Sequence, residues 1–155
     1  MVEELREAWR TNNRINLYLI DRISKEGLLC SLSKRGGRDV ARQFAHIHNN
    51  RLYQLEKRAR DLRVGLELFP TKVTPSKKEL VQALKASSTA VEEMLQGILQ
   101  GTPKRRGMRK GLFTTFAYFI AHESHHRGGI LLTLKECGHK LSPKDTMAIW
   151  GWDQM

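Results

Sequence analysis

Residues 121–129, Ala-His-Glu-Ser-His-His-Arg-Gly-Gly, contain three of the six histidines in the chain and one carboxylate. Imidazole is the commonest metal-binding side chain in proteins and the one most readily protonated near neutral pH. The segment lies inside a long stretch of helix-like apolar periodicity, where such a cluster is hard to explain as solvent-facing residues. A metal site in a helical bundle is therefore the leading hypothesis, although one helix cannot supply the whole site.

The helical positions of these histidines separate them. His122 and His126 are four residues apart, which places them about 40° from each other and one turn apart along a helix. Two imidazoles at this spacing can bind one cation, as in the helix of HExxH metalloproteases, so a helix-borne metalloprotease is one alternative. No further ligand signature flanks the helix, which disfavours that class. His125 points away from the apolar face and is predicted to lie at the surface.

A complete site needs a third ligand, because zinc and similar ions normally take at least three protein ligands. The remaining candidates are His46, His48 and His139. His139 follows a predicted helix stop at Gly138 and is expected to be exposed. His46 and His48 lie in the second predicted helix about 200° apart, so at most one can face the site. Periodicity slightly favours His48, and spacing alone leaves the choice open.

Glu123 lies on the apolar face of the same helix, beside the paired histidines. It could act as a base, or it could orient a ligand histidine from behind. The alternative is an ion pair, either with Arg127 one turn away or with Arg51 across the bundle. An Arg51 buried at an apolar stripe position would need such a partner.

Four long segments carry helix-like periodicity and none carries sustained strand-like alternation. This pattern predicts an all-α fold, a four-helix bundle with a short C-terminal helical tail, in a single domain over residues 1–155. Asp39 is the expected N-cap of the second helix, and Ser76 with Glu79 forms a capping box before the third. Gly27 and Gly138 are expected to end the first and fourth. Three predicted helices cover roughly Val2–Lys25, Asp39–Arg63 and Leu112–Cys137, and the third in chain order begins at Ser76 and is weakened or ended by Gly97 and Gly101.

Two further segments have recognisable local signals. Residues 31–37 are rich in Ser and Gly and are expected to form a loop. Ser142-Pro143 is a typical start for a short helix in the tail. Trp150 and Trp152 follow it, and we expect them to pack over one end of the bundle.

The formal net charge of the chain is +11. Such an excess can attract nucleic acid or another polyanion, or it can serve solvation alone. Part of it is concentrated in residues 104–110, Lys-Arg-Arg-Gly-Met-Arg-Lys, which are flanked by glycines and are expected to form an exposed loop. The sequence contains neither zinc-finger spacing nor an aromatic RNA-binding strand motif.

Cysteine usage and hydropathy give the expected compartment. Cys30 and Cys137 lie far apart in the sequence and form no CxxC, which is typical of a reduced cytoplasmic protein with two free thiols. No apolar run approaches the roughly 20 residues that a membrane span needs, so no membrane partner is expected. Residues 1–6 begin acidic and amphipathic, unlike a signal or transit peptide.

These motifs resemble those of the DinB family of metal-binding four-helix bundles over nearly the whole length. Residues 122–134, followed by Gly138, are similar to the family pattern of His, three residues, His, Arg, Gly, Gln and an aliphatic run that ends in Gly. Phe44-Ala45-His46-Ile47 resembles the Ala-His-aliphatic step of the family's second helix, and residues 150–152 resemble the tail of some members. The chain departs from the pattern at Gly129, where the family commonly has Gln.

The resemblance implies that His46, His122 and His126 are the ligands of a divalent metal ion such as zinc or nickel, in place of His48. It also implies activities such as those of thiol-dependent S-transferases that use mycothiol or bacillithiol. The expected partner is then a thiol cofactor or another small-molecule substrate. Gly129 removes an amide that could order the site, which weighs against catalysis.

Three hypotheses follow. The chain is a metal-dependent enzyme, either a hydrolase or a thiol S-transferase, or it is a metal-binding bundle without catalysis, or it is a basic helical protein that binds nucleic acid. A homodimer is also expected, because bundles with exposed apolar helix faces often pair.

Overall fold

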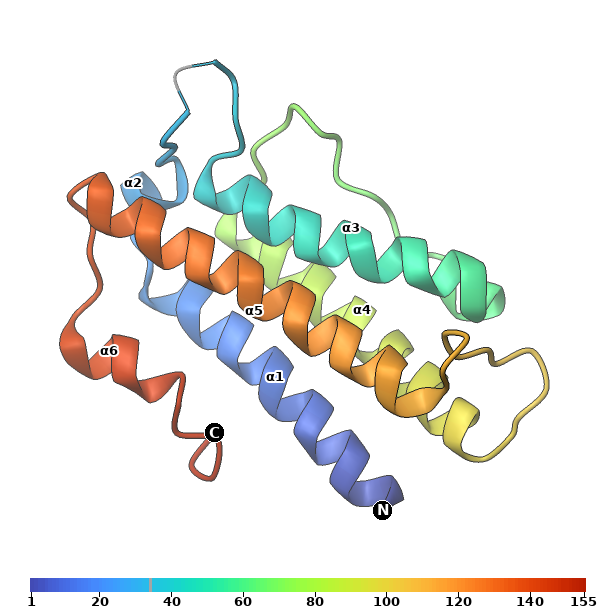
Figure 1. Ribbon diagram of the computed structural model, residues 1–155. Coiled ribbons are helices and arrows are strands. Elements are labelled where there is room, and N and C mark those ends of the chain that lie inside the picture. Colours follow the sequence, from blue (N-terminus) through green and yellow to red (C-terminus); the bar gives the residue numbers. More distant parts are fainter. Residues whose placement is uncertain (34) are drawn as a thin grey trace.

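The computed structural model describes residues 1–33 and 35–155, and it is an all-α bundle with four long helices. The prediction of the fold class is confirmed. Figure 1 shows the long helices side by side, with a short helix directly after the first long helix and another in the C-terminal tail. The elements in chain order are α1 (Val2–Arg22), α2 (Lys25–Leu28), α3 (Val40–Arg58), the 3₁₀ helix η1 (Arg60–Arg63), α4 (Lys77–Leu99), α5 (Leu112–Glu136) and α6 (Pro143–Ala148).

The connection between α3 and α4 determines the topology of the bundle. Residues 59–76 run back along the bundle, so α3 and α4 point in the same direction while α1 and α5 point the opposite way (Figure 1). Helix α4 packs against both α1 and α3, and α3 also packs against α5. The contact between α3 and α5 is the one that positions the histidines.

Local capping explains where most helices begin. Asp39 Oδ1 accepts a hydrogen bond from the Arg42 N–H at 2.7 Å, and Ser76 and Glu79 form the reciprocal capping box. Ser142 caps α6 in the same way. At the end of α5, Gly138 has a φ of 81°, a conformation that favours glycine and closes the last turn. These starts, and the stop at Gly138, confirm the predictions from sequence.

Two predicted helix ends are wrong. Helix α1 ends at Arg22 rather than near Lys25, and Gly27 lies within α2 instead of closing α1. The reason is that the Ser24 side chain accepts a hydrogen bond from the Gly27 N–H and starts a new helical turn. Helix α3 ends at Arg58, and the residues to Arg63 form the 3₁₀ helix η1 instead of continuing the α-helix.

Two apolar clusters fill the bundle, and a buried polar layer separates them along the helices. One cluster includes Ile15, Leu19, Phe44, Ile47, Ile130 and Leu134. The other includes Trp9, Leu55, Val91, Met94 and Phe119. Between them in the sequences of α1, α3 and α5 lie Asn12, Arg51 and Glu123. Asn16 lies one turn after Asn12, next to Ile15 of the first cluster, and all four polar residues are fully buried.

The tail and the early loop differ in part from expectation. Trp150 is 72% exposed and Trp152 is 37% exposed, so the prediction that both pack over the bundle end is wrong. Both line a small hollow beside α5. Residue 34, within the predicted loop 31–37, lies outside the described residues. Among the helices that are described, none has the length and apolar character needed to cross a membrane.

The two cysteines, distant in sequence, meet where α2 and the end of α5 approach each other. Both are free and half-buried. The Cys137 Sγ lies 3.9 Å from the Ser31 carbonyl oxygen. Burial and the neighbouring Cys137 thiol raise the pKa of the Cys30 thiol.

Candidate metal centre

Three histidines from two helices converge where α3 packs against α5. His46 lies on α3, and His122 and His126 lie one turn apart on α5. The ring centroids are 5.3 Å apart for His46 and His122, 4.7 Å for His46 and His126, and 4.6 Å for His122 and His126. One nitrogen from each ring lies within 4.8 Å of the others, and all three residues are half-buried.

The buried residues of α5 fix the direction in which the histidine pair points. Phe119, Glu123, Arg127 and Ile130 are buried at helical spacing and hold one face of α5 against the core. His122 and His126 each precede a member of this stripe by one position, so they lie on its flank. That flank faces α3, where His46 completes the cluster.

The environment keeps these rings neutral at physiological pH. Burial, together with the positive charge of Arg38 and the nearby His122, lowers the pKa of His46 from 6.5 to about 4. Burial and the neighbouring histidines lower the pKa of His126 to about 4 as well, and burial also lowers the pKa of His122. A neutral imidazole has a nitrogen lone pair free for a metal ion, so no proton must be displaced near pH 7.

The donor set suits a divalent transition-metal ion. Imidazole nitrogens bind zinc at about 2.0–2.1 Å, which places ligand nitrogens roughly 3.4 Å apart in a tetrahedral site. The cluster nitrogens lie within 4.8 Å of one another, so binding of an ion would bring any two of them closer by at most about 1.4 Å. Three protein ligands leave coordination positions open for a water or a small ligand.

His122 is held from behind by two polar residues. The Asn50 amide lies 3.3 Å from His122 Nδ1, and the Tyr118 hydroxyl donates to Asn50 Oδ1 at 3.1 Å. The Tyr118 ring also stacks on the His122 ring at 5.9 Å between centroids. Neither residue is predicted from the sequence, because one asparagine among several on α3 and an aromatic on α5 give no distinctive signal. These contacts orient His122 and leave its Nε2 as the nitrogen that can face an ion.

The other histidines lie outside the cluster. The ring nitrogens of His48 lie 3.1 Å from the Ala83 carbonyl oxygen and 2.9 Å from that of Glu67, on the side of α3 away from α5. The slight preference of the periodicity for His48 is therefore wrong, because His48 instead holds the segment between η1 and α4 against the bundle. His125 is exposed as predicted, whereas His139 is half-buried rather than exposed.

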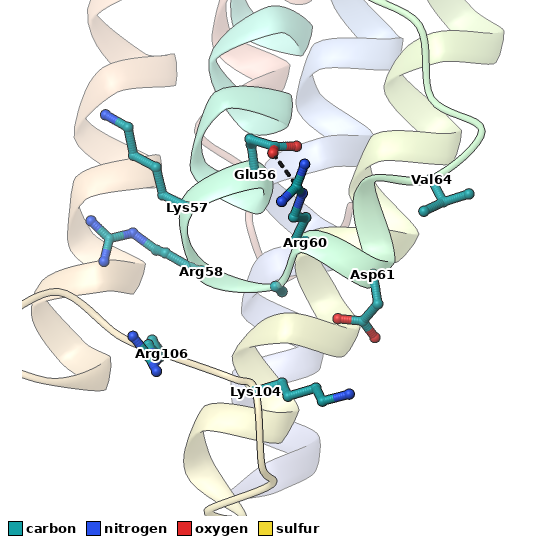
Figure 2. A pocket seen from close by; sticks show the side chains of 9 residues that line it. Glu56, Lys57, Arg58, Arg60, Asp61, Val64, Lys104 and Arg106 are labelled. Carbon is teal, nitrogen blue, oxygen red and sulfur yellow. Dashed lines mark ion pairs between the residues drawn. The ribbon is translucent and has the colours of Figure 1, made fainter.

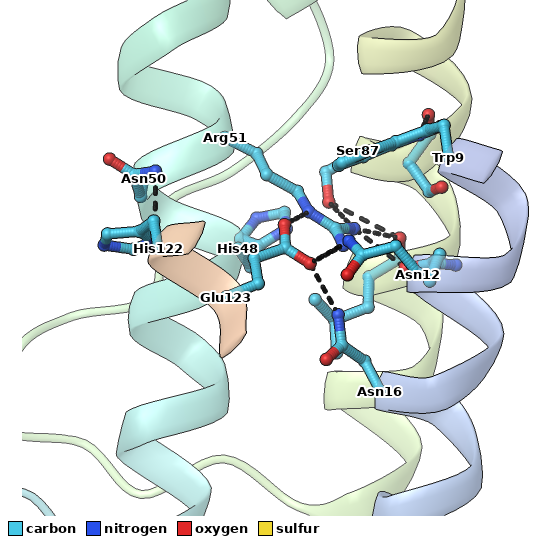
Figure 3. A network of polar contacts seen from close by, with 12 residues as sticks. Trp9, Asn12, Asn16, His48, Asn50, Arg51, Ser87, His122 and Glu123 are labelled. Carbon is cyan, nitrogen blue, oxygen red and sulfur yellow. Dashed lines mark hydrogen bonds and ion pairs between the residues drawn. The ribbon is translucent and has the colours of Figure 1, made fainter. Parts of the chain in front are cut away.

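Glu123 belongs to a buried polar network, shown in Figure 3. Its Oε1 accepts a hydrogen bond from Arg51 Nε at 2.7 Å, and its Oε2 accepts from Arg51 Nη2 at 2.9 Å. The same Oε2 accepts from the side-chain amides of Asn12 and Asn16, each at 2.7 Å. Burial alone would raise the pKa of the Glu123 carboxyl, but Arg51, Arg127 and Asn16 hold that pKa below its usual value.

Both oxygens of this carboxylate are thus occupied by donors within the core. Glu123 is fully buried, and its hydrogen bonds go to α1 and α3 rather than to a cluster histidine. The ion-pair interpretation is confirmed for Arg51, and Arg127 Nη1 lies 4.0 Å from Glu123 Oε2. A role as base is not supported by this geometry, because no oxygen is free to reach a substrate. This network is not predicted from the sequence, although Asn12 and Asn16, four residues apart among the apolar positions of α1, could have indicated it.

The structure also explains why a glycine is suited to position 129. A Cβ at this position would lie 3.1 Å from the Gln43 Oε1, so a side-chain amide from α3 already occupies the space beside it. The Gln43 amide donates to Thr133 Oγ1 at 3.4 Å. An amide is therefore present at this contact between α3 and α5, although it comes from the opposite helix.

The chain is thus a helical bundle in which three histidines from two neighbouring helices could hold a metal ion. The chain belongs to the DinB family, whose model matches residues 1–152. Comparisons with curated proteins and with solved structures give no match. The family is metal-binding, in agreement with the histidine cluster.

Proposed function

We propose that the chain binds a divalent metal ion, zinc or nickel, through His46, His122 and His126, and uses it in a reaction of a small molecule. The observation that carries this proposal is the convergence of one nitrogen from each of the three rings within 4.8 Å. Their lowered pKa values and the support of His122 by Asn50 agree with a ligand role.

A small hollow next to His46 supports the presence of a substrate or thiol site. It has a volume of about 150 Å³ and is lined by Arg38, which precedes α3, and by residues of α3 and of the segment before α4, among them Arg42, Tyr53 and Phe69. Arg42 is held by the carbonyl oxygens of Thr71 and Gly37. The two guanidinium groups favour a small molecule that carries a carboxylate or another anionic group.

The chemistry proposed is the attack of a thiol or a water on an electrophile, in which the thiol or water gives its proton to solvent and the electrophilic atom loses its leaving group. A divalent ion at the three histidines would lower the pKa of a thiol or water in its open position toward neutrality. The chain itself supplies binding through Arg38 and Arg42 and holds His122 through Asn50. Because Glu123 is engaged in the core, it provides no base beside the cluster, and the described residues 1–33 and 35–155 place no other carboxylate among the candidate ligands. That absence of a base favours a thiol, which ionises more easily than water, and makes S-transfer the preferred activity over hydrolysis.

The alternative is a metal-binding bundle without catalysis, and the occupied Glu123 is the observation that favours it. The two functions share the metal site and differ only in turnover. They are separated by screening thiols with electrophiles in the presence of the metal and again with a chelator. Chelator-sensitive product formation supports the enzyme, and metal binding without turnover supports the inert binder.

The metal site itself is tested by elemental analysis of protein purified without a histidine tag. Variants His46→Ala, His122→Ala and His126→Ala are expected to lose the bound ion. His125→Ala and His139→Ala serve as matched controls and are expected to keep it, because neither ring joins the cluster. Unchanged metal content in the three cluster variants would overturn the proposal.

A homodimer is a separate part of this proposal. Its support is the exposure of large apolar side chains, with Trp150 72% and Leu132 52% exposed. Analytical ultracentrifugation measures it directly, and a monomer at all concentrations would contradict it.

A further inference from the structure

Most of the excess positive charge lies at one end of the bundle. Residues 56–63 and 104–110 contain nine Lys or Arg residues and two acidic residues, so these two short segments carry +7 of the net +11. The first segment is the end of α3 and η1, and the second is the loop between α4 and α5. The two segments lie far apart in the sequence but line a common hollow of about 530 Å³.

The loop is fixed in place on this surface. Arg105 binds both carboxylate oxygens of Asp61 at 2.7 and 2.8 Å, and the Arg106 N–H donates to the Arg58 carbonyl oxygen at 3.0 Å. The Arg58 side chain in turn donates to the Gly107 carbonyl oxygen at 2.9 Å. The Arg105 stem lies against Gly97, where a Cβ would come within 2.6 Å of Arg105 Cγ. The basic loop is therefore held in one position rather than extended into solvent.

This anchoring uses some of the cations and leaves others available. Arg105 is paired with Asp61, and Arg60 with Glu56. Lys57, Lys104 and Arg106 line the hollow, are exposed, and have no carboxylate partner within residues 1–33 and 35–155. Figure 2 shows these side chains around the hollow. Of the paired residues, Glu56, Arg60 and Asp61 also line the hollow, and the three free cations remain for an external anion.

The backbone conformation of Lys104 indicates that the lysine side chain has a role at this position. Lys104 has a φ of 65°, and no other residue except glycine has a positive φ in the part of the chain that is described. A lysine in the left-handed region costs free energy that glycine would avoid. Lysine at this position is thus more easily explained by its charge than by its fit to the turn. The favourable interaction of cations with a helix C-terminus can explain Lys57 and Arg58 at the end of α3, but not the loop.

We propose that this basic hollow, formed by the end of α3, η1 and residues 104–110, binds the phosphate backbone of a nucleic-acid strand. A single phosphate group carries at most about two negative charges, fewer than the net charge of this surface, so an extended polyanion is the better match. A membrane surface is a poorer match, because the free cations line a concavity and Val64 is the one large apolar side chain among the residues that line it. Binding of this kind needs no metal ion and is independent of the histidine cluster.

The test measures the fluorescence anisotropy of a labelled 20-nucleotide single-stranded DNA at several salt concentrations. The triple variant Lys57→Gln, Lys104→Gln, Arg106→Gln removes the free cations and leaves the Arg105–Asp61 and Arg58–Gly107 contacts in place. We expect at least a tenfold rise in Kd. We also expect the negative slope of log K against log salt concentration to become shallower by about 2, since three phosphate contacts are lost and each contributes about 0.7. The matched control Lys78→Gln, Lys85→Gln, Lys144→Gln loses the same charge at exposed positions elsewhere and is expected to stay close to the unmodified protein.

Equal weakening in the two triple variants would overturn the proposal, because net charge alone would then explain the binding. So would binding to vesicles that contain anionic phospholipid without binding to the DNA. Circular dichroism verifies that the triple variant of Lys57, Lys104 and Arg106 is folded. If it is not folded, Lys104→Gly provides a second test, since it removes one charge and also removes the backbone strain of a residue with positive φ. A Kd unchanged by Lys104→Gly together with an unchanged salt slope would also overturn the proposal.

Discussion

Arg51 on α3 and Glu123 on α5 form a bidentate ion pair in which both side chains are fully buried, with distances of 2.7 Å from Nε to Oε1 and 2.9 Å from Nη2 to Oε2. The guanidinium also lies 4.9 Å from the centroid of the Trp9 ring and donates to the carbonyl oxygen of Leu84. This pair joins the same two helices that carry the histidines. It therefore fixes the register of α3 against α5, on which the convergence of His46 with His122 and His126 depends.

Removal of one partner of this pair is expected to be strongly destabilising. Arg51→Met leaves the Glu123 carboxylate buried without its main counter-charge, and such a loss costs about 3–5 kcal/mol. The double variant Arg51→Met, Glu123→Gln removes both charges and should recover part of the loss. Urea unfolding followed by circular dichroism measures both values.

The exposed pair Arg60–Glu56 is the matched control for this prediction. Arg60 is 84% exposed and Glu56 is 49% exposed, and they lie four residues apart, across the break between α3 and η1. Glu56→Gln should change the free energy of unfolding by less than about 0.5 kcal/mol. A cost for Arg51→Met as small as that of Glu56→Gln would show that the buried pair does not hold α3 to α5.

Asn50 is expected to determine metal affinity without contacting the ion. Groups that orient a ligand histidine typically change metal affinity by about 10- to 100-fold when removed. When Nε2 of His122 binds an ion, Nδ1 carries the proton, and Asn50 must present its oxygen to it, which a rotation of the amide allows. Asn50→Ala should weaken binding by this factor, whereas Asn50→Asp should retain it, because the carboxylate keeps an acceptor.

Competition with a chromophoric chelator measures these affinities. Tyr118→Phe is expected to fall between the unmodified protein and Asn50→Ala, since it loses the hydrogen bond to Asn50 but keeps the ring against His122. Equal affinities in Asn50→Ala and the unmodified protein would remove Asn50 from the site.

The helices and their caps could be predicted from the sequence because these features depend on neighbouring residues. Asp39, Ser76 and Ser142 each bind a backbone N–H within the next few positions, and no distant residue changes that preference. The break at Ser24 is not predicted, because Gly27 is as plausible a helix terminator in the sequence as Ser24 is a helix start. The path of residues 59–76, which makes α3 and α4 parallel, is not encoded in any local sequence pattern and so could not be predicted.

The histidine cluster was predictable in part for the same reason. The spacing of His122 and His126 is a property of one helix, but the choice between His46 and His48 depends on the side of α3 that faces α5. Periodicity placed His48 nearer the apolar stripe, and His48 is indeed buried. Burial and proximity to the cluster are different properties, however, and the carbonyl groups that receive His48 belong to α4 and to the segment before it. The family resemblance supplied the residue that periodicity did not.

The metal-free protein should lose stability as the pH falls from about 6.5 toward 4. The pKa values of His46 and His126 are lowered from 6.5 to about 4, so in this range the unfolded chain binds protons that the folded chain does not. The stability contributed by the neutral rings is present above pH 6.5 and is lost progressively as the pH falls to 4. Urea midpoints measured in the presence of a chelator at pH 7, 5.5 and 4 follow this loss.

The double variant His46→Gln, His126→Gln isolates the effect from the titration of carboxyl groups, which it shares with the unmodified protein. Its stability should depend less on pH over this range. His125→Gln is the control, since that exposed ring lies outside the cluster. Parallel pH curves for the double variant and the unmodified protein would show that these rings titrate alike in the folded and unfolded chains.

The adjacent glycines of α5 are expected to respond differently to alanine. A Cβ at Gly128 would meet nothing within 4 Å, so Gly128→Ala should stabilise the helix by about 0.5–1 kcal/mol through its higher helix propensity. A Cβ at Gly129 would lie 3.1 Å from Gln43 Oε1, and this contact should cancel part of the same gain. Gln43→Ala in the Gly129→Ala background removes the obstruction and separates the two contributions by thermal unfolding. Equal gains at the two positions would mean that Gln43 does not occupy the space beside Gly129, and the amide would then be free to take another partner at the contact between α3 and α5.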